Sequence, residues 1–285
     1  MNDNFYFEIF ANEVTVAKAK SEKTIDLFNV LNFKQLTSLE TTFESGGTRL
    51  AVSIDSTIVF TCNFFEGITA FKIENGQILW KNTKIKSIQK IDVSDDGLHL
   101  FIVTERKKFY VVDVKTGELI KQEKGISSFF KLPENKVLFI NSDNSISLKS
   151  QVNTKLFYKF ESYILDVCST EGNIIFSEMY KPLTMIEVKT GNKIWQSDLL
   201  PGYRINYLKQ VSEDIISMVG FFNNGKIDEK YLFNLETKSG MITKKTQLDS
   251  LYHSFCFSPD GLKLYCSNLD VYDTLNHLKI YPRSP

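Results

Sequence analysis

One nine-residue pattern occurs twice along the chain with little change, and its recurrence restricts the fold more than any other feature. The two copies are VSDDGLHLF at Val93–Phe101 and FSPDGLKLY at Phe257–Tyr265. Each copy combines the end of an expected strand, a tight turn with an acidic residue and a glycine, and an alternating apolar strand. Related copies are FANEVTV (10–16), VSIDSTIVF (52–60), PENKVLF (133–139), TEGNIIF (170–176) and VSEDIISM (211–218). Seven copies at intervals of 37 to 47 residues cover the chain, so the sequence predicts a repeat fold.

A second turn follows the first in most repeats. VVDVKTGELI (111–120) and MIEVKTGNKIW (185–195) are nearly identical, and AFKIENGQILW (70–80) is a third version. Gly76, Gly117 and Gly191 stand where a tight turn requires a positive φ angle. Each repeat therefore contains four expected strands, which we label A to D. They are joined by an A–B turn, a B–C loop and a C–D turn, and a D–A connection leads to the next repeat.

This organisation predicts the fold class. Four short strands in about 40 residues are typical of a β-propeller blade, and no helical periodicity separates them. We predict an all-β fold, a seven-bladed β-propeller of four-stranded antiparallel blades, in a single domain over residues 1–285. Each blade is expected to consist of contiguous chain, whereas the alternative, a two-sheet sandwich, does not account for seven repeats. The expected blades span approximately 4–38, 47–82, 87–123, 127–160, 163–198, 204–246 and 251–282.

Two hairpins resemble those of known propeller families. FSPDGLKLYCSN (257–268) is similar to the A–B hairpin of WD-repeat and surface-layer-type propellers, and the two KTG segments resemble the C–D hairpin of quinoprotein-like repeats. The resemblance implies the propeller fold. The chain has no Trp-Asp dipeptide, no Gly-His pair and no adjacent cysteines, and its only tryptophans are Trp80 and Trp195. We therefore expect neither the WD hydrogen-bond network nor bound pyrroloquinoline quinone, and we predict no cofactor.

The charge balance and the apolar segments restrict the partners. Lys plus Arg and Asp plus Glu both number 34, which argues against a nucleic-acid binder with its usual excess of positive charge. The first residues lack the apolar run of a signal peptide, and no segment has the roughly 20 apolar residues of a membrane helix. The four cysteines have no C-x-x-C spacing, and we expect reduced thiols. These features predict a cytoplasmic protein without a membrane span.

The sequence contains no recognisable catalytic or metal-binding motif. His99, His253 and His277 share no short spacing that would place two of them on one metal ion. We interpret Asp96 and Asp260 as turn residues that cap their own backbone. We therefore predict no catalytic or metal residues, although a hydrolase or lyase with its site at the channel mouth stays an alternative, because such a site leaves no local motif. A sugar- or small-ligand-binding propeller is a third possibility.

The B–C loops and D–A connections are where the repeats differ most, and in a propeller they emerge on one face. The B–C loops at 62–68, 177–183 and 220–231 contain large apolar side chains. Aromatic residues, Met and Arg on one rim are typical of protein-binding hot spots. The alternative is that the phenylalanines pack between blades, although strand alternation must send one of each adjacent pair outward. The predicted partner-binding residues are Phe64, Phe65, Arg106, Lys107, Tyr180, Tyr203, Arg204, Phe221 and Phe222.

These observations favour a non-enzymatic propeller that binds another protein as a scaffold or adaptor. An immunity-type inhibitor of a partner protein is one specific form of this hypothesis.

Overall fold

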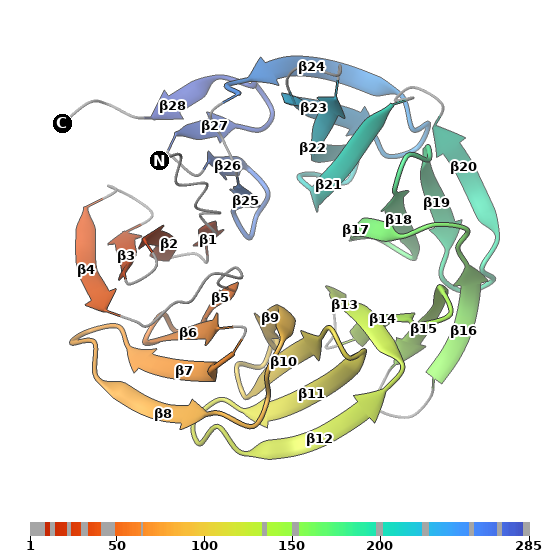
Figure 1. Ribbon diagram of the computed structural model, residues 1–285. Helices are drawn as coiled ribbons and strands as arrows, with labels where there is room; N and C mark the ends of the chain where they lie inside the picture. Colours follow the sequence, from red (N-terminus) through yellow and green to blue (C-terminus); the bar gives the residue numbers. More distant parts are fainter. Residues whose placement is uncertain are drawn as a thin grey trace. The chain divides into compact units, whose positions relative to one another are not determined.

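The computed structural model describes residues 9–11, 15–21, 24–29, 34–40, 49–63, 65–132, 136–149, 154–197, 202–223, 228–250, 254–266 and 270–281. These residues form seven four-stranded sheets and no helix (Figure 1). In every sheet the neighbouring strands are consecutive in sequence, and their registers are antiparallel. The prediction of an all-β propeller with four-stranded antiparallel blades of contiguous chain is therefore confirmed.

The chain divides into two compact units, so the single domain over 1–285 stays a prediction. The first unit comprises residues 1–143 and 149–151. Its first sheet contains β1 (Ile9–Ala11), β2 (Thr15–Ser21), β3 (Thr24–Asn29) and β4 (Gln35–Glu40). The second contains β5 (Arg49–Val52), β6 (Ile58–Asn63), β7 (Gly67–Lys72) and β8 (Ile78–Asn82). The third contains β9 (Ile88–Val93), β10 (His99–Thr104), β11 (Lys108–Asp113) and β12 (Leu119–Lys124), and β13 (Ile126–Leu132) and β14 (Lys136–Asn141) follow it.

The second unit comprises residues 144–148 and 152–285. It holds most of β15 (Ser145–Lys149) and β16 (Thr154–Lys159), which complete the fourth sheet with β13 and β14. The fifth sheet contains β17 (Ile164–Thr170), β18 (Asn173–Glu178), β19 (Leu183–Glu187) and β20 (Lys193–Ser197). The sixth contains β21 (Tyr203–Gln210), β22 (Ile215–Asn223), β23 (Asp228–Glu236) and β24 (Ile242–Leu248). The seventh contains β25 (Phe255–Phe257), β26 (Lys263–Cys266), β27 (Val271–Asp273) and β28 (Lys279–Tyr281).

The A–B turns are stabilised by a repeated hydrogen-bond pattern between a serine and an aspartate two residues later. In the third sheet, Ser94 Oγ donates to Asp96 Oδ1 at 2.5 Å, and the same carboxylate accepts a bond from the backbone N of Leu98 at 2.9 Å. Ser53 with Asp55 and Ser258 with Asp260 repeat this arrangement, with Oγ–Oδ1 distances of 2.6 and 2.5 Å. The acidic residues therefore close their own turns, which is the role that the sequence predicted for Asp96 and Asp260.

Packing of a tryptophan on the C–D turn of the following sheet accounts for both the glycines and the tryptophans of these repeats. Gly117 has a φ angle of 73°, and Gly240 has one of 72°. The Trp80 ring of β8 lies against Gly117 of the next sheet, where an added Cβ would be 2.5 Å from the ring. Trp195 of β20 covers Gly240 in the same way at 2.9 Å. The indole nitrogens donate to the carbonyl oxygens of Val114 and Thr237, so each tryptophan fastens its sheet to the following one.

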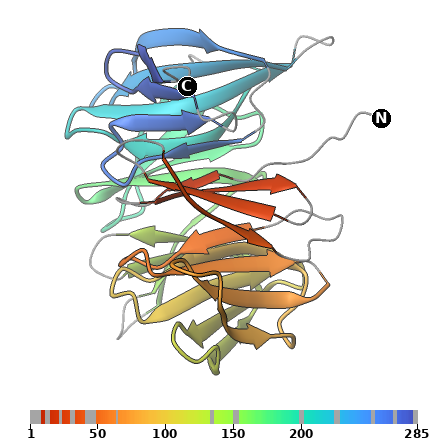
Figure 2. The same cartoon turned by 90° about the vertical axis from the view of Figure 1, so that its left-hand side faces the viewer.

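The hydrophobic core lies between successive sheets within each unit. In the first unit, Phe60 of β6 packs with Leu100 and Ile102 of β10, and all three are fully buried. In the second unit, Ile175 of β18 packs with Ile216 of β22. Figure 2 shows the second and third sheets, in orange and yellow, as twisted neighbouring layers. The period-two alternation of the strands supplies both faces of each sheet with apolar side chains.

Candidate functional site

Two exposed tyrosines lie in neighbouring loops of the second unit. Tyr163 belongs to the D–A connection before β17 and is 59% exposed, and Tyr180 belongs to the B–C loop between β18 and β19 and is 71% exposed. The backbone N of Met179 donates to the carbonyl oxygen of Tyr163 at 2.8 Å, which holds the two loops together. Large aromatic side chains with this exposure are a typical feature of protein-binding surfaces.

The buried carboxylate of Glu178 fixes these two loops. Glu178 is only 8% exposed, and its Oε2 accepts bonds from the backbone N atoms of Glu161 and Ser162 at 3.2 and 3.1 Å and from Ser162 Oγ at 3.2 Å. At the surface, Lys181 Nζ lies 2.9 Å from Glu161 Oε2. The hydrogen bond and charge of Lys181 lower the pKa of Glu161 below its ordinary value. The tyrosines are therefore presented by a tied pair of loops, which reduces the entropy lost on binding.

The backbone of Tyr180 is strained. Its φ angle is 58°, in the left-handed region that glycine adopts without cost. A tyrosine in this conformation costs about 1 kcal/mol. Residues in strained backbone conformations of this kind cluster at active sites and binding sites.

A second aromatic group lies on β21, β22 and β23 of the sixth sheet. The ring of Tyr203 is 5.1 Å from that of Phe222 and 5.4 Å from that of Phe233. Lys245 Nζ donates to the hydroxyl of Tyr203 at 2.8 Å and lies 4.1 Å from the Tyr231 ring centroid. Tyr203 and Phe222 are half-buried, so part of each ring stays accessible at the surface.

The exposure expected for Phe221 is not found. Phe221 is 9% exposed, and its ring packs 5.9 Å from Phe255 of the seventh sheet and 6.4 Å from Tyr207. The guanidinium of Arg204 lies 5.3 Å from the Phe221 ring centroid. Strand alternation accounts for the difference between Phe221 and Phe222: the first faces the neighbouring sheet and the second does not. Phe221 therefore contributes to the packing between the sixth and seventh sheets.

The remaining predicted residues belong to the first unit. Phe65 is 52% exposed in the B–C loop between β6 and β7, and Phe64 lies outside the described residues. Arg106 and Lys107 are exposed in the B–C loop between β10 and β11. Tyr163 was not among the predicted residues. The signal for it was an aromatic residue after the polar Glu161 and Ser162, immediately before an alternating strand.

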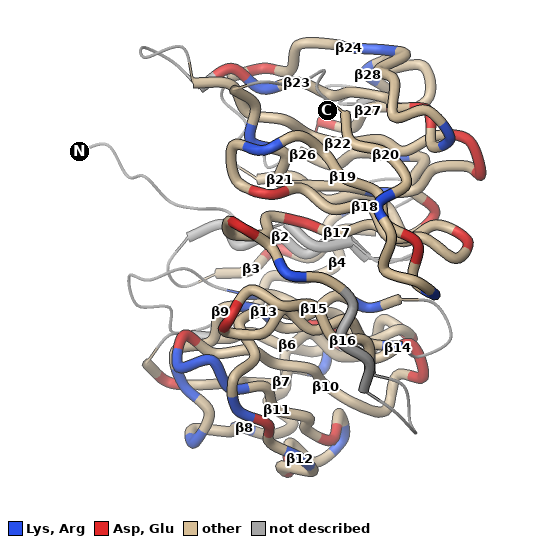
Figure 3. Tube along the Cα trace, turned by 90° about the vertical axis from the view of Figure 1, so that its right-hand side faces the viewer, with Lys and Arg blue, Asp and Glu red and all other residues tan. Residues whose placement is uncertain are grey.

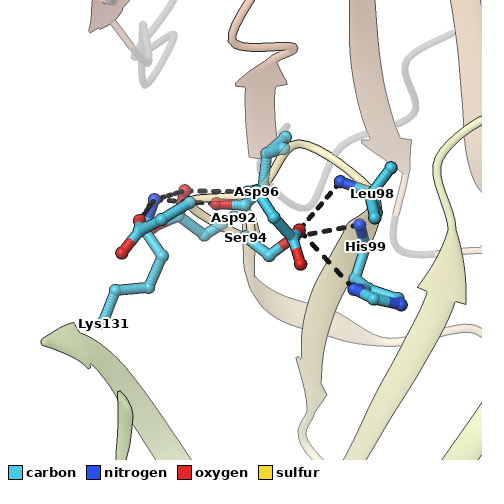
Figure 4. Close-up of polar contacts among 8 residues, drawn as sticks. Asp92, Ser94, Asp96, Leu98, His99 and Lys131 are labelled. Atoms are coloured by element: carbon cyan, nitrogen blue, oxygen red, sulfur yellow. Dashed lines mark hydrogen bonds and ion pairs between the residues drawn. The ribbon is translucent and has the colours of Figure 1, made fainter. Parts of the chain in front are cut away.

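The A strands of the third and fourth sheets carry a polar cluster of a different kind. Lys131 Nζ lies 3.1 Å from Asp92 Oδ1 and 3.5 Å from Asp95 Oδ1, and it donates to the carbonyl oxygen of Val93 at 2.7 Å. Figure 4 shows this lysine beside the turn in which Ser94 and Asp96 are bonded. Burial raises the pKa of Asp96, but the bonds from Ser94 and Leu98 outweigh it and lower the pKa overall. Lys131 lies between the carboxylates of Asp92 and Asp95, an arrangement that suits a structural role.

The two described histidines belong to different sheets, His99 to the third and His277 to the seventh. His277 is buried with Nδ1 2.9 Å from Thr246 Oγ1, and burial and Lys244 lower its pKa to about 4. His99 Nδ1 lies 3.6 Å from Asp96 Oδ1, and His253 lies outside the described residues. Within the described ranges, no group of three or more His, Cys, Asp and Glu residues could hold a metal ion. Cys256 pairs with Tyr265 and Cys266 with Phe255, so these two thiols do not face each other.

Comparisons with known proteins agree with the fold. The family model described as outer membrane protein assembly factor BamB (PQQ_2) matches residues 16–123, which is less than half of the chain. No curated protein matches the sequence. Among solved structures, the RRP9 WD40 repeats align with a TM-score of 0.72 at 11% identity over 92% of this chain and 88% of that one. BamB from Moraxella catarrhalis aligns with a TM-score of 0.65 at 10% identity over 89% and 78%. The β-propeller domain of Myceliophteria thermophila Cps50 (Swd1) aligns with a TM-score of 0.72 at 8% identity over 93% and 94%.

The chain is a β-propeller. The resemblance to WD-repeat and quinoprotein-like propellers that the two hairpins predicted is confirmed by these matches. At 8 to 11% identity the structural likeness establishes the fold alone. In the part of the chain that the structure describes, there is no helix long and apolar enough to cross a membrane.

Proposed function

We propose that this propeller is a non-enzymatic scaffold or adaptor that binds another protein through its B–C loops and D–A connections. The observation that carries the proposal is the pair Tyr163 and Tyr180, which are exposed by 59% and 71% on loops tied by the buried Glu178. Inhibition of the bound protein, as by an immunity protein, is one form of this function. A reducing compartment such as the cytoplasm suits the four cysteines, all of them described and none of them in a disulfide.

The remaining candidate anchors belong to loops of the same kind in each unit. In the second unit, Tyr203, Arg204 and Phe222 lie at the start of β21 and the end of β22. Ser177 Oγ donates to the carbonyl oxygen of Ile205 at 2.7 Å, so the end of β18, next to the Tyr180 loop, contacts the start of β21. In the first unit, Phe65, Arg106 and Lys107 are the exposed candidates.

The test is a pull-down with the double variant Tyr163→Ser/Tyr180→Ser. An exposed aromatic anchor at a protein interface typically contributes about 2 kcal/mol or more, so we expect the specific partner to be lost. The matched control is Met241→Ser/Leu278→Ser, which removes side chains that are 60% and 66% exposed at C–D turns. The control should retain the partner, and both variants should keep the wild-type melting temperature because their changed residues are exposed. Retention of every specific partner by the folded tyrosine variant would contradict the proposal.

A further inference from the structure

In the first unit, the B–C loops and D–A connections of adjacent sheets form a continuous row. Gly67 approaches the next connection so closely that an added Cβ would lie 2.2 Å from the carbonyl oxygen of Asn82 and 3.0 Å from that of Ile85. The backbone N of Glu105 donates to the carbonyl oxygen of Ser87 at 2.9 Å, which joins this connection to the following B–C loop.

The row continues to the end of β12. The carbonyl oxygen of Lys107 accepts bonds from the backbone N atoms of Gly125 and Ile126 at 2.8 and 3.1 Å. Ser87 and Lys107 both have a φ angle of 55°, and these backbone bonds hold them in that conformation. We define the basic row as residues 65–67, 83–87, 105–107 and 124–125.

The basic row concentrates positive charge in a chain that is neutral as a whole. It contains five cationic side chains against the two carboxylates of Glu66 and Glu105. The cationic residues are Lys84, Lys86, Arg106, Lys107 and Lys124, and all five are exposed. Figure 3 shows the blue Lys and Arg segments beside β8, β9 and β11.

In the part of the chain that the structure describes, the five cations of the basic row are not neutralised by neighbouring carboxylates. Within the described residues, none of the five side chains forms an ion pair. By contrast, Lys72 pairs with Glu74 at 2.5 Å, and Lys121 pairs with Glu123 at 2.8 Å. Unpaired like charges repel one another, and an anionic ligand relieves this repulsion.

An exposed aromatic residue lies at one end of the row. Phe65 is 52% exposed, and its loop touches the connection that carries Lys84 and Lys86 through Gly67. A row of cations that follows adjacent loops and begins at an apolar side chain fits an extended chain with several carboxylates and one apolar residue.

We propose that the basic row binds an acidic polypeptide segment of the partner, with an apolar side chain of that segment against Phe65. The proposal rests on the proposed protein-binding function and names the chemistry of the partner. A nucleic acid fits less well, because its binders usually have a pI above about 9, whereas this chain has a pI of about 6.8. Charge complementarity of this kind acts chiefly on the association rate and the choice of partner.

The test measures binding of a fluorescein-labelled 12-residue peptide, rich in Glu and containing one Leu, by fluorescence anisotropy with the full chain. We expect Arg106→Glu/Lys107→Glu to weaken the peptide Kd by at least about tenfold, and higher salt to weaken wild-type binding because the charges are exposed. Glu105→Lys adds a cation to the row and should tighten binding about threefold. A peptide with Gln in place of each Glu should not bind.

The matched control is Lys115→Glu/Lys189→Glu, which makes the same charge change at two exposed C–D turns. This control should retain the wild-type Kd. Equal Kd values for the control and for Arg106→Glu/Lys107→Glu would overturn the proposal. Tighter binding of a 20-nucleotide RNA, or of phosphatidylserine-containing vesicles, than of the acidic peptide would also overturn it.

A parallel pull-down separates failure of this proposal from failure of the proposed function. If Arg106→Glu/Lys107→Glu retains the wild-type partner and the acidic peptide does not bind, the basic row is not the docking site, although protein binding stands. If the wild type retains no specific protein, the proposed function itself fails. Loss of the partner by this variant together with loss of the peptide is the result that we expect.

Discussion

The C–D turns and the B–C loops both contain residues in the left-handed conformation, but they fill these positions differently. Four C–D turns have glycine there, at Gly76, Gly117, Gly191 and Gly240, whereas three B–C loops have Lys107, Asn144 and Tyr180. The C–D glycines are required where the preceding sheet packs on the turn, as Trp80 does on Gly117. Where no neighbour packs on the backbone, a side chain is tolerated at the cost of strain.

Gly67 supports this explanation because it is a glycine in a B–C loop. Its backbone meets the carbonyl oxygen of Asn82, so here a side chain would collide. The difference between the two regions therefore follows from whether another part of the chain packs against the backbone at that position. Packing between blades therefore restricts the residue type at the C–D turns. In a B–C loop without such a contact, the left-handed position accepts different residues, so the side chain there can serve binding.

The largest effect that tests this comparison is expected for Gly117→Ala. The added Cβ combines left-handed strain with a collision against the Trp80 ring, and we expect a loss of about 3 kcal/mol in the free energy of unfolding. Urea unfolding measures this loss. The control is Gly172→Ala, which has a φ angle of 71° and no atom within 4 Å of an added Cβ, and it should lose only about 1 kcal/mol. Equal losses for the two variants would show that packing on the C–D turn is not the reason for glycine.

The C–D turn of the seventh sheet has a histidine, His277, in the left-handed conformation. His277 has a φ angle of 55° and stands where four other C–D turns have glycine. Burial and Lys244 lower its pKa to about 4, while Asp273 opposes the shift. The unfolded chain therefore binds more protons between pH 6.5 and 4, so stability falls as the pH decreases through this window.

The expected loss from His277 between pH 7 and pH 4 is on the order of 2 kcal/mol. His277→Asn should flatten this pH dependence, because asparagine tolerates the left-handed conformation and does not titrate. Urea unfolding at pH 7 and pH 4 compares the two proteins. A variant that keeps the full wild-type loss would show that the titration of His277 does not contribute.

The smallest effect is expected for Tyr180→Gly and has the opposite sign for stability. Glycine removes the left-handed strain, so the free energy of unfolding should rise by up to about 1 kcal/mol. Binding of the partner should weaken at the same time, because the exposed ring is lost. Tyr163→Gly is the control: Tyr163 is not among the residues with positive φ, so the variant should weaken binding without a gain in stability. A Tyr180→Gly protein that is less stable than the wild type would show that left-handed strain at Tyr180 does not reduce the free energy of unfolding.

The repeat and its turns could be read from the sequence because their interactions are local. Ser94, Asp96 and Leu98 form their hydrogen bonds within a few residues, and the same Ser-x-Asp pattern recurs in two other A–B turns. Alternation along the strands predicted that one phenylalanine of the pair Phe221 and Phe222 faces inward. It could not predict which, because the burial of Phe221 depends on Phe255 in the next sheet.

The sequence alone determined an all-β chain of seven repeats, each with four strands and glycine-containing turns, because period-two alternation and turn chemistry act between neighbouring residues. Only the tertiary structure decided the exposure of the loop side chains and the joining of loops between sheets. The bonds of Glu178 to residues 161 and 162, and of Ser87 to Glu105, connect residues 16 to 18 positions apart. Such contacts depend on how successive sheets pack, and the spacing of residue types along the chain does not encode them.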